Sequence, residues 1–221
     1  MLAALDERGY AVWPGLLDPV ECRELTALYD GDSAFRSRVV MARHNFGSGE
    51  YKYLRYPLPP LVAELRESLY GSLAPLANRW HERARLAARF PATLEAYLAR
   101  CHAAGQQRPT PLILKYEAGD YNRLHQDLYG EFVFPVQATV LLSAPGDDFA
   151  GGEFLLVEQR ARMQSRGEVV PLHQGDVVVF AVNHRPVAGA RGFSRARMRH
   201  GVSPLRSGRR FTLGIIFHDA A

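Results

Sequence analysis

The segment RRFTLGIIF, residues 209–217, has two chemically different faces if it forms a β-strand, because successive side chains of a strand point to opposite sides. One face is apolar and suits a packed core layer; it carries Phe211, Leu213, Ile215 and Phe217. Arg210, Thr212 and Gly214 share the other face, a set that indicates a cavity wall. A guanidinium binds a carboxylate through two hydrogen bonds, a threonine hydroxyl adds another, and glycine leaves room. We therefore expect Arg210 and Thr212 to bind a dicarboxylate.

A histidine and a carboxylate lie two residues apart in His125-Gln126-Asp127, and a distant histidine, His200, precedes Arg210 by ten residues. On an extended strand, residues i and i+2 point to the same side, so His125 and Asp127 can reach one ion. Two imidazoles and one carboxylate on one side of a metal leave coordination positions open for a chelating co-substrate and O2. The pattern predicts a mononuclear Fe(II) site at His125, Asp127 and His200.

Two of these assignments have a competitor in the sequence. His184 lies closer to the apolar segment 175–180, but no arginine-bearing strand follows it at the right spacing, so we expect it beside the site or in an insert spanning 185–199. Arg209 competes with Arg210, and strand parity favours Arg210 because Arg209 falls on the apolar face. His218 and Asp219 are expected to be tail residues.

Three further segments appear in a familiar order around these residues: YEAGDY at 116–121, DFAGGEF at 148–154 and GDVVVF at 175–180. Together with H-x-D, the distal histidine and the arginine, they resemble the Fe(II)- and 2-oxoglutarate-dependent dioxygenase superfamily. Within it, segments 199–203 and 213–219 resemble a bacterial family of oxygenases that act on damaged nucleic acid. The ten-residue spacing from His200 to Arg210 is instead similar to that of prolyl hydroxylases.

The resemblance implies an α+β fold, in which N-terminal helices pack against a double-stranded β-helix (jelly roll) with the metal at its open end. It implies Fe(II) at His125, Asp127 and His200, with 2-oxoglutarate and O2 as co-substrates. Arg210 and Thr212 would bind the distal carboxylate of 2-oxoglutarate. Tyr116 is either a hydrogen-bond donor to that co-substrate or a core tyrosine with a satisfied hydroxyl.

Composition fits one soluble globular domain: of 221 residues, 47% are hydrophobic and 23% are charged. The two cysteines, Cys22 and Cys101, form no CxxC motif, which favours a reducing cytoplasm over a disulfide-bonded or zinc-bound protein. In the segment MLAALDER at 1–8, charged residues begin at Asp6, which leaves no room for the apolar stretch of a secretory signal. No apolar run reaches membrane-spanning length. We therefore expect a cytoplasmic protein without a membrane partner.

Periodicity divides the single domain, 1–221, into two parts. Residues 1–110 are expected to be mainly helical support with a substrate-side hairpin at 38–56. Asp18 and Pro19 predict a helix start, as does Pro91. From 111 to 221 the period changes to two, with turn residues between short apolar runs, which predicts the jelly-roll catalytic core.

The substrate is indicated by two clusters of cations. Segment 43–56 interleaves cations with aromatic residues, on which bases can stack, and it is faintly similar to the nucleotide-recognition lid of AlkB-type dealkylases. The alternative is a hairpin whose aromatic residues pack on the barrel. A second cluster either follows a phosphate backbone or is solvated loop; its members are Arg191, Arg195, Arg197, Arg199 and Arg206.

The sequence therefore predicts an enzyme that hydroxylates a C–H bond while 2-oxoglutarate is decarboxylated to succinate. The favoured substrate is alkylated or otherwise damaged nucleic acid, DNA or RNA, from which the reaction would remove an alkyl group. The alternative is a prolyl or other residue of a protein or peptide. A third hypothesis is a non-catalytic jelly-roll binding module, against which the complete ligand set argues.

Overall fold

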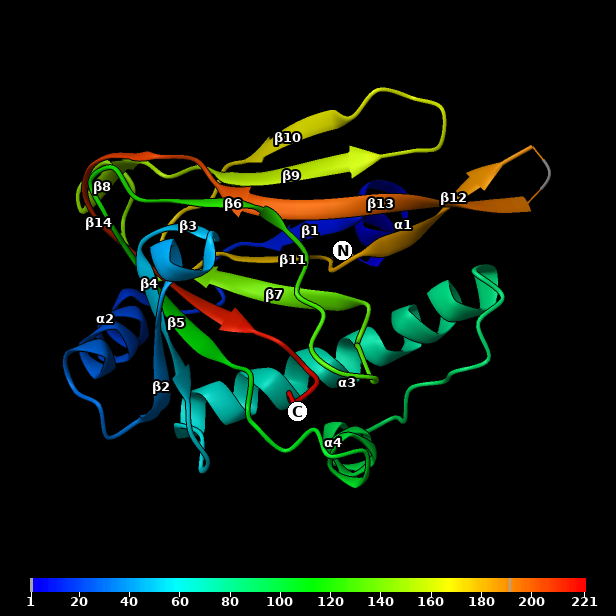
Figure 1. Ribbon diagram of the computed structural model, residues 1–221, viewed down its shortest axis with the longest axis horizontal. Coiled ribbons are helices and arrows are strands. Elements are labelled where there is room, and N and C mark those ends of the chain that lie inside the picture. Colours follow the sequence, from blue (N-terminus) through cyan, green and yellow to red (C-terminus); the bar gives the residue numbers. More distant parts are fainter. Residues whose placement is uncertain (1, 191) are drawn as a thin grey trace.

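The computed structural model describes residues 2–190 and 192–221, which form two antiparallel sheets that face each other (Figure 1). The helices are α1 (Leu2–Arg8), α2 (Pro19–Ala27), α3 (Pro60–Arg83) and α4 (Leu94–Ala103), with 3-10 turns η1 (Leu28–Asp30) and η2 (Met41–His44). Helices α2, α3 and α4 lie outside the larger sheet, and α1 lies beside β1 (Tyr10–Trp13) and β12 (His184–Gly189). None of these helices is both long and apolar enough to span a bilayer.

The larger sheet has eight strands, seven of them in one continuous order, and β8 pairs with β14 beside that order. The order is β1 (Tyr10–Trp13), β11 (Val177–Ala181), β7 (Val136–Leu141), β14 (Leu205–Ile215), β5 (Leu112–Glu117), β4 (Glu50–Leu54) and β2 (Phe35–Val40), with β8 at Phe149–Gly151. β7 and β11 are buried along their whole length, which matches their apolar sequences.

The smaller sheet has six strands, with β12 pairing to β13 beside the main order. The order is β10 (Arg166–Val170), β9 (Phe154–Gln159), β13 (Gly192–Val202), β6 (Tyr121–His125) and β3 (Gly47–Ser48), with β12 at His184–Gly189. The segment 185–199, which the sequence suggested as an insert, is therefore a β-hairpin that continues the sheet.

Local sequence explains where the helices begin. Asp18 caps α2 as predicted: its side chain accepts hydrogen bonds from the backbone of Val20 and Glu21, and Glu21 completes a capping box. The prediction that Pro91 opens a helix is wrong by a few residues, because α4 begins at Leu94. The Thr93 hydroxyl accepts a hydrogen bond from Ala96 N and so fixes that start.

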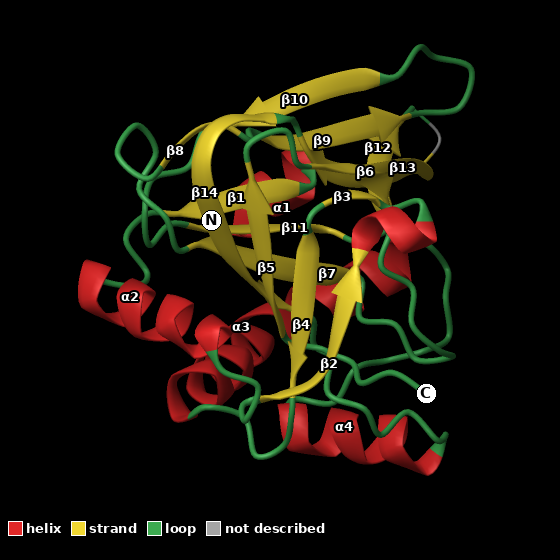
Figure 2. Cartoon of the chain, turned by 60° about the vertical axis from the view of Figure 1, so that its left-hand side comes forward, coloured by secondary structure: helices red, strands yellow, loops and turns green. Residues whose placement is uncertain are grey.

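The main core lies between the larger sheet and the helices α3 and α4, which run beneath that sheet (Figure 2). The apolar face predicted for β14 and the residues after it packs there, since Phe211, Leu213, Ile215 and Phe217 all belong to this core. Residues 2–110, expected to be mainly helical, also supply β1, β2 and β4 to the larger sheet. A second apolar cluster fills part of the space between the sheets.

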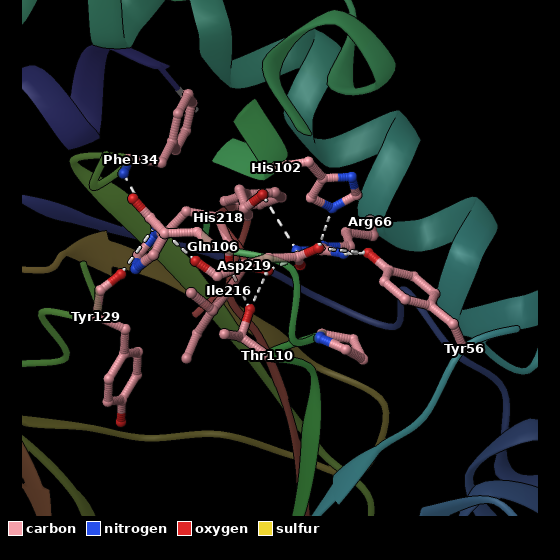
Figure 3. Close-up of polar contacts among 12 residues, drawn as sticks. Tyr56, Arg66, His102, Gln106, Thr110, Tyr129, Phe134, Ile216, His218 and Asp219 are labelled. Atoms are coloured by element: carbon pink, nitrogen blue, oxygen red, sulfur yellow. Dashed lines mark hydrogen bonds and ion pairs between the residues drawn. The ribbon is translucent and has the colours of Figure 1, made fainter. Parts of the chain in front are cut away.

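His218 and Asp219 are not tail residues, because both side chains are fully buried, and Asp219 contacts Arg66 of α3 and His102 of α4 (Figure 3). The Asp219 carboxylate pairs with Arg66 Nη2 at 2.8 Å and lies 2.8 Å from His102 Nε2. The backbone N–H of Phe134 donates to His218 Nδ1 at 3.3 Å. Burial lowers the pKa of His218 to about 4, with the Arg66 charge adding to the effect. The cause is tertiary: Arg66 is buried on α3 and needs a carboxylate partner.

Candidate metal centre and its cavity

The register of the smaller sheet brings the two predicted histidines together. His200 on β13 lies directly opposite His125 on β6, and their ring centroids are 4.1 Å apart. Asp127 follows β6 by two residues, so its carboxylate reaches the same point. One ligand atom from each of the three side chains lies within 4.8 Å of the other two. The structure therefore groups His125, Asp127 and His200 as the sequence predicts.

The hydrogen bonds around the cluster orient its donor atoms. His125 Nδ1 lies 2.7 Å from the carbonyl oxygen of Arg123. A carbonyl can only accept, so Nδ1 carries the proton and the lone pair of Nε2 faces Asp127, whose Oδ1 is 3.6 Å away. His200 Nε2 lies 3.3 Å from Asp127 Oδ2. With its proton on Nδ1, His125 presents the free Nε2 lone pair that a divalent cation needs from an imidazole ligand.

The electrostatics of the cluster fit a cation. Burial alone raises the pKa of Asp127, but the hydrogen bond with His200, the charges that His200 and His125 carry when protonated at low pH, and the hydrogen bond from Gln137 outweigh it and leave the pKa lowered. Burial lowers the pKa of His200, with the nearby His125 adding to the effect. The carboxylate thus stays ionised and the buried imidazole stays neutral, the protonation states in which both side chains bind metal.

The opposite wall of the cavity comes from the larger sheet. The cavity has a volume of about 180 Å3. On the side of the larger sheet it is lined by Arg210, Thr212, Gly214 and Tyr116. Arg210 lies opposite Tyr116 in the register of β14 and β5, and its guanidinium carbon is 5.7 Å from the centre of the Tyr116 ring. Every residue predicted to bind the co-substrate therefore lines the same cavity as His125, Asp127 and His200.

Arg210 is a buried cation without a counter-ion among the described residues. Its side chain is 1% exposed, and neither Nε nor Nη1 has a hydrogen-bond partner. Burial lowers the pKa of its guanidinium to about 10. An unpaired charge in such a place costs several kcal/mol, so the cavity is built for an anion that supplies the missing partner.

The two competitors lie elsewhere. Arg209 is exposed and lines a different hollow, on the α2 side of the larger sheet. His184 begins β12 and lines a second hollow next to the cavity, with no ligand atom in the three-residue cluster. Tyr116 is fully buried, and its hydroxyl lies 3.4 Å from Asn122 Nδ2.

Two residues that hold Asp127 were missed by the sequence analysis. Gln137 Nε2 donates to Asp127 Oδ2 at 2.7 Å, and the Tyr129 hydroxyl donates to Oδ1 at 2.8 Å. The signal for Gln137 was present: Gln137 and Thr139 are polar residues two apart in the otherwise apolar strand VQATVL. The same alternation identified Arg210 and Thr212 on β14. Tyr129 gave no comparable signal.

An exposed aromatic residue stands at the rim of the cavity. Phe46 lines the cavity and is 47% exposed, and its ring stacks on His44 with 5.4 Å between centroids. Its carbonyl accepts a hydrogen bond from Arg123 N at 2.9 Å, which ties the loop to β6. Gly47 has φ of 134°, and a Cβ there would lie 2.3 Å from Tyr121 O, so only glycine fits. The loop is therefore built to hold Phe46 in place.

Residues 49–220 match a protein family described as "Oxygenase, catalysing oxidative methylation of damaged DNA". This chain belongs to that family. The uncharacterized protein Rv2227 of Mycobacterium tuberculosis (strain ATCC 25618 / H37Rv) is 52% identical over 165 residues, which cover 75% of this chain and 71% of Rv2227. The predicted membership of an oxygenase family is confirmed, and with it the prediction of an enzyme over a non-catalytic binding module.

Solved structures share the fold at low identity. A 2OG-Fe(II) oxygenase family oxidoreductase from Burkholderia pseudomallei is 17% identical with a TM-score of 0.53, and the match covers 100% of this chain and 91% of that one. A Trichoplax adhaerens prolyl hydroxylase, solved with a hypoxia inducible factor peptide fragment, is 15% identical with a TM-score of 0.57, covering 96% and 84%.

These likenesses confirm the predicted double-stranded β-helix fold. Membership of the family makes the chain an oxygenase, and the fold and the His-Asp-His cluster fit Fe(II), 2-oxoglutarate and O2.

Proposed function

We propose that the protein hydroxylates a carbon–hydrogen bond on a modified base of nucleic acid, with His125, Asp127 and His200 as the Fe(II) ligands. When bound, Fe(II) supplies a centre at which 2-oxoglutarate and O2 yield succinate and CO2 and one oxygen atom enters the substrate C–H bond. If that bond belongs to an N-alkyl group, the hydroxylated product breaks down to an aldehyde and the repaired base.

The observation that carries the co-substrate assignment is the unpaired guanidinium of Arg210 in the same cavity as the three-residue cluster. A dicarboxylate can place one end at the cluster and the other on Arg210, where the two charges neutralise each other out of water. Thr212 lines the cavity two residues further along the same strand face, and its hydroxyl would donate a hydrogen bond to the carboxylate that Arg210 binds. The Tyr116 hydroxyl adds a donor from β5.

The rim supports a flat aromatic substrate. The exposed Phe46 ring is fixed at the cavity entrance and is backed by His44, so a base entering the cavity has a surface on which to stack. Arg43 and Arg123 are exposed near this loop, and they add positive charge where a phosphate would pass. The description of the family points to the same substrate class.

A peptide is the second candidate substrate. The Trichoplax adhaerens enzyme of the same fold was solved with a peptide fragment, and the spacing from His200 to Arg210 is similar to that of prolyl hydroxylases. A peptide would use the rim differently, because an extended backbone needs hydrogen-bond partners rather than a stacking surface.

The deciding experiment presents N-alkylated oligonucleotides and proline-containing peptides side by side to the Fe(II)-loaded protein with 2-oxoglutarate. Mass spectrometry then follows the loss of an alkyl group from the base or the gain of one oxygen on the peptide, and succinate is measured in parallel. We expect oligonucleotide turnover and no peptide oxidation. Peptide oxidation alone would overturn the nucleic-acid assignment and leave the iron assignment intact.

Phe46→Ala tests the rim, and Phe46→Tyr is its matched control. We expect the Ala variant to raise KM for the oligonucleotide by about 10-fold, since stacking on an aromatic side chain contributes about 1–3 kcal/mol per base. The Tyr variant retains a ring and should behave like the wild type. Succinate formation without prime substrate should be unchanged in both.

A further inference from the structure

Three arginines of β13 form a regular row, in which Arg195 and Arg197 are exposed and Arg199 is half-buried. Arg195, Arg197 and Arg199 alternate with the buried residues Ala196, Met198 and His200, so all three point to the outer face of the smaller sheet. Alternate residues of a strand are about 6.6 Å apart. The row therefore presents one guanidinium after another along a line that ends next to the metal-binding candidate His200.

These arginines lack carboxylate partners. None of the three takes part in an ion pair among the described residues, and the one polar contact found for them is a 3.4 Å hydrogen bond from Arg195 to the carbonyl of Ala84. Arg197 lies between His184 on β12 and Gln159 on β9, and Arg199 lies opposite Val157. Like charges on one strand face repel each other, and a bound anion would offset that repulsion.

Two arginines outside the row do have carboxylate partners. Arg185, on the opposite face of β12, is buried, and its Nε donates to Glu158 Oε2 at 2.8 Å. Arg206, which the sequence grouped with the row, faces Glu153 at 3.4 Å. Arg191, the fifth member of that group, lies outside the described residues. The row thus lacks the carboxylate partners of Arg185 and Arg206, and at one end it contacts the C-cap residue of α3 through Arg195.

The row leads into a hollow that shares a wall with the metal cavity. In the segment after β6, Gln126, Asp127 and Tyr129 line the metal cavity, whereas Leu128 and Gly130 line this second hollow. Arg195 and His184 also line the hollow, together with the apolar side chains of Trp80 and Pro186, and none of its described lining residues is acidic. A flat apolar group that carries a negative charge suits such a surface.

We infer that the β13 row and the adjoining hollow bind the unpaired nucleic-acid strand that flanks the target base. Each arginine would meet a phosphate, and the hollow would receive a neighbouring nucleotide while the target base enters the metal cavity. An unpaired strand fits because a base can reach an enclosed site only when it has left its stack. This inference rests on the proposed nucleic-acid substrate.

The test compares two triple variants that lose the same charge. One replaces the row by Arg195→Gln, Arg197→Gln and Arg199→Gln, and the other replaces the exposed, unpaired Arg23, Arg55 and Arg209 by Gln. Binding of a labelled single-stranded oligonucleotide is measured by fluorescence anisotropy over a range of salt concentrations. For the row variant, we expect the slope of log K against log salt to become shallower by about 2, since each single-strand phosphate contact contributes about 0.7.

We expect the control variant to keep the wild-type slope, and both variants to turn over a small alkylated nucleoside at the wild-type rate. Equal losses in the two variants would show an effect of net charge and overturn the inference. The inference would also be overturned if the row variant lost binding to an acidic peptide while its oligonucleotide slope stayed at the wild-type value. If the wild type acts on peptides and on no nucleoside or oligonucleotide, the proposed function itself has failed.

Discussion

The two sheets of this protein differ in what covers their outer faces. The larger sheet is packed against α3 and α4, and its central strands β7 and β11 are buried on both sides. The outer face of the smaller sheet carries three arginines of β13, of which Arg195 and Arg197 are exposed and Arg199 is half-buried. Both sheets contribute inner residues to the site: imidazoles from the smaller sheet, and Arg210 and Gln137 from the larger. In the function proposed above, the larger sheet therefore binds the co-substrate and the smaller sheet binds the polymer.

The largest expected effect is on the proposed metal ligands. Asp127→Ala removes the carboxylate between the two imidazoles, so we expect Mn(II) or Co(II) binding measured by calorimetry to weaken by more than about 100-fold, beyond the usual effect of losing an outer hydrogen-bond partner. His184→Ala is the control, because that histidine lies on the same sheet outside the cluster, and it should bind metal like the wild type. Equal losses in both variants would contradict the three-residue site.

The next effect tests the role of the larger sheet. Arg210→Ala should weaken 2-oxoglutarate binding by at least about 30-fold, since losing one partner of a buried charge pair costs about 2 kcal/mol or more. Arg209→Ala is matched in sequence position but exposed, and it should change binding little. Without 2-oxoglutarate, Arg210→Met should melt at or above the wild-type Tm, because the unpaired buried cation is gone. A lower Tm would mean that the guanidinium has a partner in the empty cavity.

A smaller effect is expected at the hydrogen bond between the larger sheet and the metal cluster. Gln137→Leu keeps the side-chain size and removes the donor to Asp127 Oδ2, so we expect metal affinity to fall by about 10-fold. The readout is metal binding by calorimetry, with circular dichroism showing that the fold is kept. An unchanged affinity would show that Tyr129 alone holds the carboxylate.

The smallest effect concerns the network beneath the larger sheet, which we expect to influence stability and not catalysis. Burial holds the folded-state pKa of His218 near 4, whereas an unfolded histidine has a pKa of about 6.5. The unfolded chain therefore binds a proton first, and stability falls as the pH drops from about 6.5 towards 4. Between pH 7 and pH 5.5 this costs about 1 kcal/mol.

Urea unfolding of the metal-free protein at these two pH values measures the cost. His218→Gln keeps an acceptor and does not titrate, so it should lose about 1 kcal/mol less than the wild type over that interval. The same pH dependence in both proteins would place the effect on other histidines.

Much of the site was predictable because its signals are local. The alternation in 209–217 separated the core face of β14 from the cavity face and selected Arg210 over Arg209. The capping residues of α2 gave its start for the same reason. Pro91 misled because the capping side chain comes two residues later, at Thr93, and sets the start of α4 at Leu94.

Residues whose position depends on distant contacts were missed. His218 and Asp219 were expected in the tail, because nothing near them in the sequence shows that Arg66 forms an ion pair with Asp219 beneath the larger sheet. The segment 185–199 was expected as an insert, because its pairing with β9 and the rest of the smaller sheet depends on residues far away in the sequence.

By itself, the sequence determined which residue types stand at strand spacing: a histidine and an aspartate two apart, a second histidine, and an arginine on a polar strand face. Only the tertiary structure decided that His125 and His200 lie opposite each other, that Gln137 holds Asp127, and that the arginines of β13 face away from the cavity. The physical reason is that side-chain direction alternates within one strand, whereas the pairing of strands is set by burial across the whole fold.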